Sequence, residues 1–180
     1  MADVGSLLVV TGPPGAGKST VARLLADAAH HSVVVEGDAF FGFVATGAVD
    51  PWLHAARSQN EIVGRAAAAA AGAFASGGYT TVYDGVVDPW SLPAFGADTG
   101  LEQLDYVILL PPVDTCVRRV ATRQDHGFTD EPATRKMHAE FTDAEIAERH
   151  VFRDPPEDPA EVLAHIESAR AASELAYALR

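Results

Sequence analysis

Residues 7–20 read LLVVTGPPGAGKST, an apolar run that leads straight into a glycine-rich loop. The loop GPPGAGKS, residues 12–19, fits the pattern G-x-x-x-x-G-K-[ST] in full, and residues 20–25, TVARLL, continue as a helix would. A strand that turns directly into a helix leaves backbone N–H groups without partners at the positive end of the helix dipole, where an anion binds. The stretch therefore predicts a phosphate-binding loop (P-loop, or Walker A motif) between a strand and a helix.

This loop predicts a bound nucleoside triphosphate with Mg²⁺. The glycines let the backbone curl around phosphate oxygens, Lys18 is expected to reach the β- and γ-phosphates, and the Ser19 hydroxyl to ligate Mg²⁺. The sequence holds no guanine-specific N-K-x-D motif, so ATP is the default nucleotide, while GTP stays open. The expected nucleotide-binding residues are Gly12, Pro13, Pro14, Gly15, Ala16, Gly17, Lys18, Ser19 and Thr20.

Length and composition favour one globular domain over residues 1–180. A chain of this size can bury roughly 70 % of its unfolded surface. The 48% of hydrophobic and 21% of charged residues are ordinary for a soluble protein, and no apolar stretch approaches the length of a membrane span. No signal peptide is evident, and Cys116 is the single cysteine, so we expect a cytoplasmic protein without an internal disulfide.

The charge balance argues against nucleic acid as a partner. The formal net charge is −12, whereas affinity for a polyanion comes mostly from basic groups. Lys18 and Lys136 are the only two lysines, so arginines must supply most of any phosphate neutralisation. The oligomeric state is not indicated.

Short apolar runs alternate with longer helical patterns, which predicts an α/β fold: a three-layer, doubly wound, parallel five-stranded sheet. Strands are expected over residues 7–11, 32–36, 80–84, 106–110 and 150–153. Helices are expected over residues 18–29, 52–76, 113–123, 131–141 and 160–179. Segments rich in Gly, Pro or Asp are expected to be loops: residues 93–100, 124–130 and 154–159.

Two carboxylates follow strand ends, where ligands of open α/β sheets bind. Asp84 ends the third strand and is a candidate for holding Mg²⁺, directly or through water. Asp38 follows the second strand and is the better candidate for the base that takes a proton from a hydroxyl acceptor. Either residue could instead cap a helix or a turn, and the choice of base between the two stays open.

A cluster of arginines predicts a short lid over residues 119–141. Arg119 and Arg123 are four residues apart and share a helix face, and Arg135 lies on the helix after the next loop. An arginine aimed at the transferring phosphoryl group stabilises the transition state, and a closing lid excludes water. Lys18, Asp38, Arg119, Arg123 and Arg135 are therefore the expected catalytic residues, although surface ion pairs are the usual fate of such arginines.

With these motifs the chain resembles the small P-loop kinases of metabolites and antibiotics, such as chloramphenicol phosphotransferase, gluconate kinase and, more distantly, the zeta-toxin sugar-nucleotide kinases. The resemblance spans nearly the whole chain and rests on GPPGAGKST (12–20), EGDAF (36–40), VYDGV (82–86) and RVATRQDHGF (119–128). It implies a sheet like that of nucleoside monophosphate kinases, ATP with Mg²⁺, and an acidic base after the second strand, here Asp38.

The acceptor site departs from gluconate kinases, because residues 40–61 lack their lysine and P-L-x-D-x-D-R run and the third strand lacks their C-S-A-L-K. Gluconate is therefore not the expected acceptor. The aromatic residues Phe40, Phe41, Phe43, Trp52 and Trp90 suit an apolar or ring-bearing compound, although core packing is their more ordinary explanation. The acceptor is expected to contact Asp38, Phe40, Phe41, Trp52, Arg57 and Asp84.

These features together predict an ATP-dependent kinase that transfers the γ-phosphoryl group to a hydroxyl of a small molecule, with an antibiotic as one candidate acceptor. A neutral or cationic acceptor suits the acidic balance best. The alternative is a regulatory P-loop protein that uses nucleotide occupancy as a switch and needs no acceptor. The identity of the acceptor is not indicated.

Overall fold

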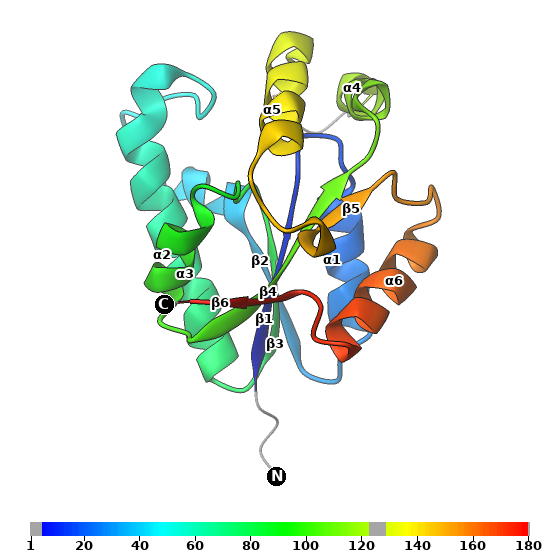
Figure 1. Ribbon diagram of the computed structural model, residues 1–180. Coiled ribbons are helices and arrows are strands. Elements are labelled where there is room, and N and C mark those ends of the chain that lie inside the picture. The colour runs from blue at the N-terminus through cyan, green and yellow to red at the C-terminus, as the bar shows by residue number, and fades with distance from the viewer. Residues whose placement is uncertain (1–4, 123–128, 180) are drawn as a thin grey trace.

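The computed structural model describes residues 5–122 and 129–179, which form a six-stranded sheet covered by helices (Figure 1). Five strands are parallel, in the order β2-β3-β1-β4-β5, and β6 pairs antiparallel with β4. The strands are β1 (Ser6–Thr11), β2 (Ser32–Glu36), β3 (Thr80–Asp84), β4 (Gln103–Leu110), β5 (Val151–Arg153) and β6 (Ala176–Ala178). The predicted five parallel strands are thus confirmed.

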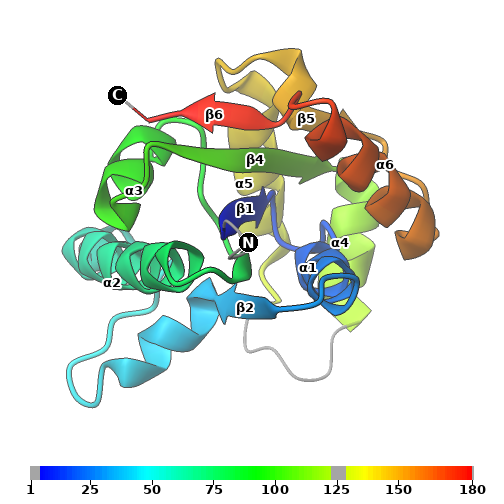
Figure 2. The ribbon, with the colours of Figure 1, turned by 90° about the horizontal axis from the view of Figure 1, so that it is seen from below.

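Helices cover both faces of the sheet, which confirms the three-layer, doubly wound prediction. Figure 2 shows α1 and α6 on one face and α2 and α3 on the other, and Figure 1 shows α4 and α5 beyond the carboxyl ends of the strands. The helices are α1 (Lys18–Asp27), α2 (Arg57–Ser76), α3 (Leu92–Thr99), α4 (Val113–Thr122), α5 (Glu131–Asp143) and α6 (Pro159–Ala171). Short 3₁₀ segments are η1 (Gly37–Phe43), η2 (His54–Ala56) and η3 (Glu148–His150).

The central strand β1 is buried on both sides, as its continuous apolar run predicts. Successive side chains point to opposite faces of a strand. Leu7 and Val9 accordingly pack into the core under α2 and α3, and Leu8 and Val10 into the core under α1 and α6. The phosphate-binding loop therefore starts from a strand that is buried on both faces of the sheet.

Residues 93–100 form α3 and not the predicted loop. Their Gly and Pro residues act as end signals: Pro93 lies in the first turn, and Gly100 ends the helix with a φ of 70°. Leu92 and Phe95 are buried against the sheet, and this tertiary packing stabilises a helix of only eight residues.

The predicted helix over residues 160–179 is too long, because α6 ends at Ala171. Ser173 has a φ of 58°, which turns the chain back, and the backbone N–H of Tyr106 donates to the carbonyl of Leu175. The following residues pair with the amino-terminal part of β4 as β6. The sequence analysis missed this sixth strand, because its three residues lie at the end of a helical pattern.

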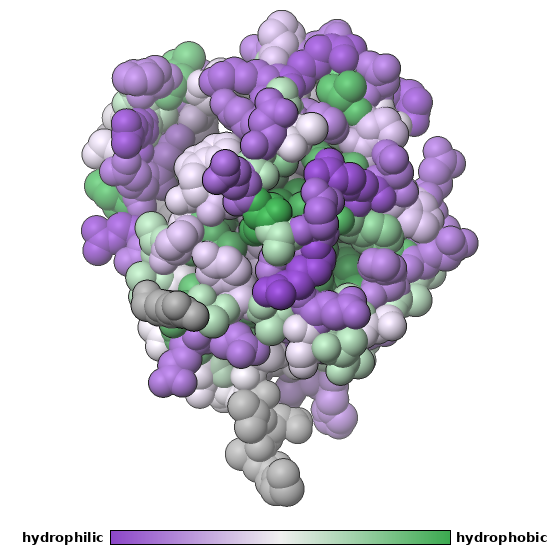
Figure 3. Space-filling view, in the orientation of Figure 1, coloured by the Kyte–Doolittle hydropathy of each residue, from purple (hydrophilic) through white to green (hydrophobic). Residues whose placement is uncertain are grey.

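The face in Figure 3 is hydrophilic over most of its area, with hydrophobic residues gathered at its centre, between α5 and β6. Ile146, Val151 and Tyr177 are partly buried hydrophobic residues that pack against the core beneath. None of the helices within the described ranges is long and apolar enough to span a membrane.

The packing of α2 on α3 yields a stability prediction with a matched control on the same helix. A Cβ at Gly72 would lie inside contact distance of the Thr99 carbonyl, whereas a Cβ at Gly64 meets no atom within 4 Å. We expect Gly72→Ala to lower the free energy of unfolding by about 1–3 kcal/mol through overpacking. Gly64→Ala should raise it by about 0.5–1 kcal/mol through helix propensity. Urea denaturation measures both, and equal effects of the two variants would contradict the close packing at Gly72.

Candidate active site

The phosphate-binding loop joins β1 to α1 and has the backbone that its glycines predict. Gly12, Gly15 and Gly17 have φ values of 141°, 79° and 94°. A side chain at Gly12 would collide with the carbonyl of Leu109, and one at Gly15 with the backbone of Cys116. No side chain caps α1, so the N–H groups of its first turn face the loop without a side-chain acceptor. The loop is thus built to approach an anion with its backbone.

Lys18 and Ser19 begin α1 inside this loop. The Lys18 ammonium donates to the carbonyl oxygens of Gly12 at 3.0 Å and Pro13 at 3.1 Å. The Ser19 side chain lies close enough to the carboxylate of Asp84, at the end of β3, to lower the pKa of that group. The structure therefore brings together the lysine, the hydroxyl and the carboxylate that the sequence analysis assigned to the phosphates and Mg²⁺.

Asp84 is a buried acidic group with a raised pKa. Burial is the main cause of the rise, and the charges of Asp38 and Glu36 add to it. The Ser19 side chain and the Lys18 charge act in the opposite direction. A carboxyl group whose pKa is perturbed by burial together with specific charge partners is a candidate functional residue.

Asp38 lies beside Asp84 but in a different environment. Strands β2 and β3 are paired in register, with Glu36 opposite Asp84, and Asp38 follows in the first turn of η1. Gly37 lies so close to the Tyr83 hydroxyl that a side chain there would collide with it. Asp38 itself is exposed, whereas Asp84 is 9% exposed. The two candidate carboxylates thus share a site but differ in access to solvent.

The segment after β3 is anchored to the sheet from two sides. The backbone N–H of Val87 donates to the Thr11 hydroxyl at 2.9 Å, and the Tyr106 hydroxyl donates to the Val87 carbonyl at 2.7 Å. His150 in turn holds the Tyr106 carbonyl through Nδ1 at 3.0 Å. These buried bonds fix Asp84 relative to the phosphate-binding loop, and sequence reasoning gave no role to any of the four residues.

The predicted lid arginines occupy different positions. The Arg119 guanidinium points to the phosphate-binding loop and donates to the Gly15 carbonyl at 3.4 Å. Arg135 donates hydrogen bonds to Glu131 of α5 at 2.9 Å and to Asp114 of α4 at 3.0 Å. Arg123 lies outside the described residues, as does part of the predicted lid.

The predicted acceptor residues also fall into two groups. Phe40 and Phe41 are partly buried, and Phe40 packs against the core, as the ordinary explanation predicts. Trp52 is exposed, as are Phe43 and Trp90, so core packing does not explain these three rings. Arg57 forms an exposed ion pair with Glu61 at 3.1 Å on the first turn of α2.

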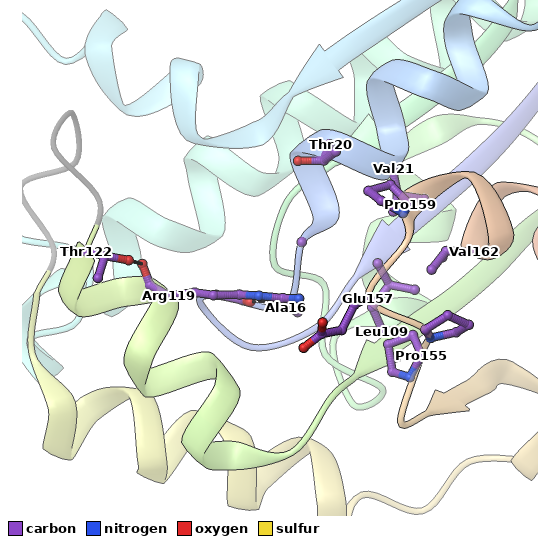
Figure 4. Close-up of a pocket in the computed structure, with 13 residues that line it drawn as sticks. Ala16, Thr20, Val21, Leu109, Arg119, Thr122, Pro155, Glu157, Pro159 and Val162 are labelled. Carbon is purple, nitrogen blue, oxygen red and sulfur yellow. Dashed lines mark hydrogen bonds between the residues drawn. The ribbon is translucent and has the colours of Figure 1, made fainter.

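A cavity of about 360 Å³ adjoins the outer side of the phosphate-binding loop (Figure 4). In Figure 4, Arg119 reaches in from α4, Pro155 and Glu157 come from the segment between β5 and α6, and Pro159 begins α6. The cavity is lined by Gly15, Ala16, Gly17, Thr20, Val21, Leu109, Arg119, Thr122, Pro155, Pro156, Glu157, Pro159 and Val162. Sequence reasoning placed a loop at residues 154–159 but missed its part in this cavity. Its place after a strand end was the available signal.

Solved structures with this fold include several kinases. A sugar kinase from Janibacter sp. HTCC2649 has a TM-score of 0.69 at 18% identity, covering 94% of this chain and 96% of that chain. The tunicamycin resistance protein of Deinococcus radiodurans gives 0.66 at 15% identity, covering 92% and 95%. A gluconokinase from Sinorhizobium meliloti 1021 gives 0.64 at 21% identity, covering 97% of each chain. At these identities the likeness establishes the fold alone.

A comparison with protein families defines the family of this chain. The chain spans 45% of the length of a chain from the Pnkp1/Rnl/Hen1 RNA repair complex, which it also resembles, and no protein of curated function matches its sequence. A family of AAA domains matches residues 7–145, from β1 to the end of the lid helices. The predicted small P-loop kinase type is thereby confirmed, and this chain belongs to that AAA domain family.

Proposed function

We propose that this chain is an ATP- and Mg²⁺-dependent kinase that transfers the γ-phosphoryl group to a hydroxyl of a small molecule. The observation that carries the proposal is that two neighbouring carboxyl groups differ in their surroundings. Asp84 is buried next to Ser19 of the phosphate-binding loop, whereas Asp38 is exposed. Phosphoryl transfer needs one group that organises the phosphates and another that activates the acceptor. The family and the kinase fold support the same reaction class.

The nucleotide is held by two parts of the molecule in this proposal. Backbone N–H groups of residues 12–20 and the Lys18 ammonium bind the phosphates. The cavity outside the loop binds the nucleobase of ATP, which lies between the planar Arg119 guanidinium and the rings of Pro155 and Pro156. Its volume of about 360 Å³ has room for a purine and part of a ribose.

The residues at the loop fit a magnesium ion. No group of three or more His, Cys, Asp or Glu side chains suited to a metal occurs among the described residues. Mg²⁺ prefers one or two protein oxygens together with phosphates and water, and Ser19 and Asp84 offer this set. When bound there, the ion would neutralise charge on the β- and γ-phosphates.

Asp38 serves as the base in this proposal. It is exposed at the start of η1, where an acceptor hydroxyl can reach it, while Asp84 is buried next to Ser19. Asp38 takes the proton of the hydroxyl as the oxygen attacks the γ-phosphorus. Arg123 and Arg135 neutralise charge on the transferring group, for which Arg135 must leave Asp114 and Glu131. Arg119 lines the cavity and holds the nucleobase instead.

Among acceptors, a hydroxylated antibiotic is the version to test first. A solved structure of similar fold is a tunicamycin resistance protein, and three aromatic rings are exposed on the acceptor side. We place the protein in the cytoplasm and expect no nucleic acid or membrane partner. The exposed rings and Asp38 favour a kinase over a nucleotide switch, because a switch requires no acceptor site.

The first experiment measures ADP release from Mg²⁺-ATP with hydroxylated antibiotics, sugars, nucleosides and nucleoside monophosphates, with mass spectrometry of each hit. We expect a gain of one phosphate on one class of compound. On that compound, Asp38→Asn should lower kcat about 10²- to 10⁴-fold without weakening ATP binding. Asp27→Asn, at the far end of α1, is the control. Near-wild-type turnover of Asp38→Asn would make Asp84 the base, and tight ATP binding with no stimulated turnover would favour the switch.

Asp84→Asn separates a functional from a structural role of this carboxyl group. Because burial raises the pKa of Asp84, the folded protein loses stability as the pH rises and the group ionises. Asparagine does not ionise, so the stability of the variant relative to wild type should increase as the pH rises above about 4, the ordinary pKa of an aspartate. Turnover with Mg²⁺-ATP should fall about 10²-fold or more. Urea denaturation without nucleotide and steady-state kinetics measure the two effects. A pH-independent stability difference with normal turnover would refute both.

Arg119→Ala tests whether the nucleobase of ATP binds in the cavity. The guanidinium lines the cavity, so its loss should raise the dissociation constant for ATP about tenfold. Arg118→Ala removes an exposed arginine from the same helix and should leave ATP affinity within about twofold of wild type. Isothermal titration calorimetry compares the two variants, and equal weakening would mean that only the overall charge of α4 matters.

A further inference from the structure

Exposed hydrophobic side chains gather in two segments, residues 43–62 and 86–90. Six of the eight large hydrophobic residues with high exposure in the described ranges belong to them, and Phe43 and Trp90 are 76% and 59% exposed. The six are Phe43, Trp52, Leu53, Ile62, Val86 and Trp90. The other two, Phe74 and Tyr79, lie where α2 leads into β3, at the opposite end of the sheet. We call the six residues the aromatic rim.

The aromatic rim flanks the two carboxylates of the site. Asp38 lies in the first turn of η1, which ends at Phe43 and packs against α2. Val86 and Trp90 follow Asp84 within the segment that Thr11 and Tyr106 anchor. In Figure 1, the chain after β2 and the chain after β3 both run beside α2 at the carboxyl end of the sheet. A compound that offers a hydroxyl to Asp38 would therefore lie against exposed apolar surface.

The charge around this site is negative. Burial is the main cause of the raised pKa of Asp84, and the nearby charges of Asp38 and Glu36 raise it further. Burial likewise is the main cause of the raised pKa of Asp88, and the charge of Glu140 adds to it. Three arginines of α1 and α2 are matched by carboxylates: Arg23 by Glu36 at 3.1 Å, Arg57 by Glu61 at 3.1 Å and Arg65 by Asp98 at 3.5 Å. Lys136 pairs with Glu140 at 3.4 Å in the same way. Lys18 is directed into the phosphate-binding loop. An anionic acceptor would meet repulsion here, and an ammonium group would be attracted.

On the basis of the proposed kinase activity, we infer that the acceptor is a cationic amino alcohol with an apolar ring. Its ring lies on the aromatic rim, its hydroxyl faces Asp38, and its ammonium group is drawn to the carboxylates after β2 and β3. Aromatic faces and carboxylates both attract cations, so the two observations point to one chemistry. The charge complementarity selects this occupant over a second protein chain, which would have to bury the carboxylates unpaired.

The tryptophans of the chain report on this surface directly, because there are only two, Trp52 and Trp90, and both belong to the aromatic rim. Tryptophan fluorescence is titrated with three matched diols in Mg²⁺ and a non-hydrolysable ATP analogue. The probes are 2-amino-1-phenylpropane-1,3-diol, its neutral N-acetyl derivative, and the anion 2,3-dihydroxy-3-phenylpropanoate. We expect the amine to bind about tenfold tighter than the neutral compound and the anion to bind most weakly.

Two variants test the source of this preference. Asp88→Asn keeps an oxygen that can accept from the Ser91 N–H, as Asp88 does at 3.0 Å, but removes the charge. Together with Glu140→Gln it should reduce the preference for the amine at least threefold. Phe74→Leu, away from the aromatic rim, should leave it unchanged.

The outcomes separate this inference from the proposed function. Equal or tighter binding of the neutral or anionic probe, no binding of any probe, or an unchanged preference in the double variant would overturn the inference. A fluorescence change that follows protein concentration would assign the aromatic rim to a second copy of the chain. An amine that binds preferentially but gains no phosphate from ATP would contradict the kinase alone. A phosphorylated neutral or anionic probe, with the amine inert, would contradict only the amine.

Discussion

The register between β1, β2 and β3 is the constraint on which the rest of the site depends. Val10 and Glu36 both lie opposite Asp84, so the three parallel strands end together at the phosphate-binding loop. Side chains alternate along a strand, and a shift of one residue would turn Asp84 to the other face of the sheet. The buried bonds from Thr11 and Tyr106 to Val87 prevent such a shift, because breaking them would leave polar groups unpaired in the core. A short stretch of sheet thus sets the distance between nucleotide and acceptor.

The carboxyl groups of Asp38 and Asp84 lie in different environments, which suits them to different roles in the proposed reaction. Asp84 is buried and lies close to Ser19 and Lys18. These surroundings suit a carboxylate that holds a metal ion beside the phosphates in a fixed position. Asp38 is exposed in a 3₁₀ segment with access to the acceptor side. Two carboxylates whose surroundings separate their properties are a recurring way to assign different roles in one reaction. Position after a strand predicted that both matter, but only burial distinguishes them.

The sequence predicted those parts of the site that depend on neighbours along the chain. The loop at residues 12–19, the strands on either side of it and Asp38 and Asp84 at strand ends follow from local patterns. The cavity beside the loop could not be predicted, because Arg119, Pro155 and Val162 come together only through folding. The sequence did not predict the short elements α3 and β6 for the same reason. Tertiary contacts with the sheet stabilise them, and their own periodicity does not.

Charge in this acidic protein is divided between the two sides of the phosphate-binding loop. Lys18 and Arg119 direct their cations to the loop itself, while carboxylates follow β2 and β3 on the other side. The two arrangements depend on one another, since a site for several phosphate charges needs cations that a net charge of −12 makes scarce. On α2, Arg57 pairs with Glu61 and Arg65 with Asp98, so carboxylates balance the charge of these two arginines. In the proposed reaction, the cations therefore lie where the nucleotide binds, and the carboxylates lie where the acceptor binds. This distribution of charge favours an acceptor that is itself positively charged.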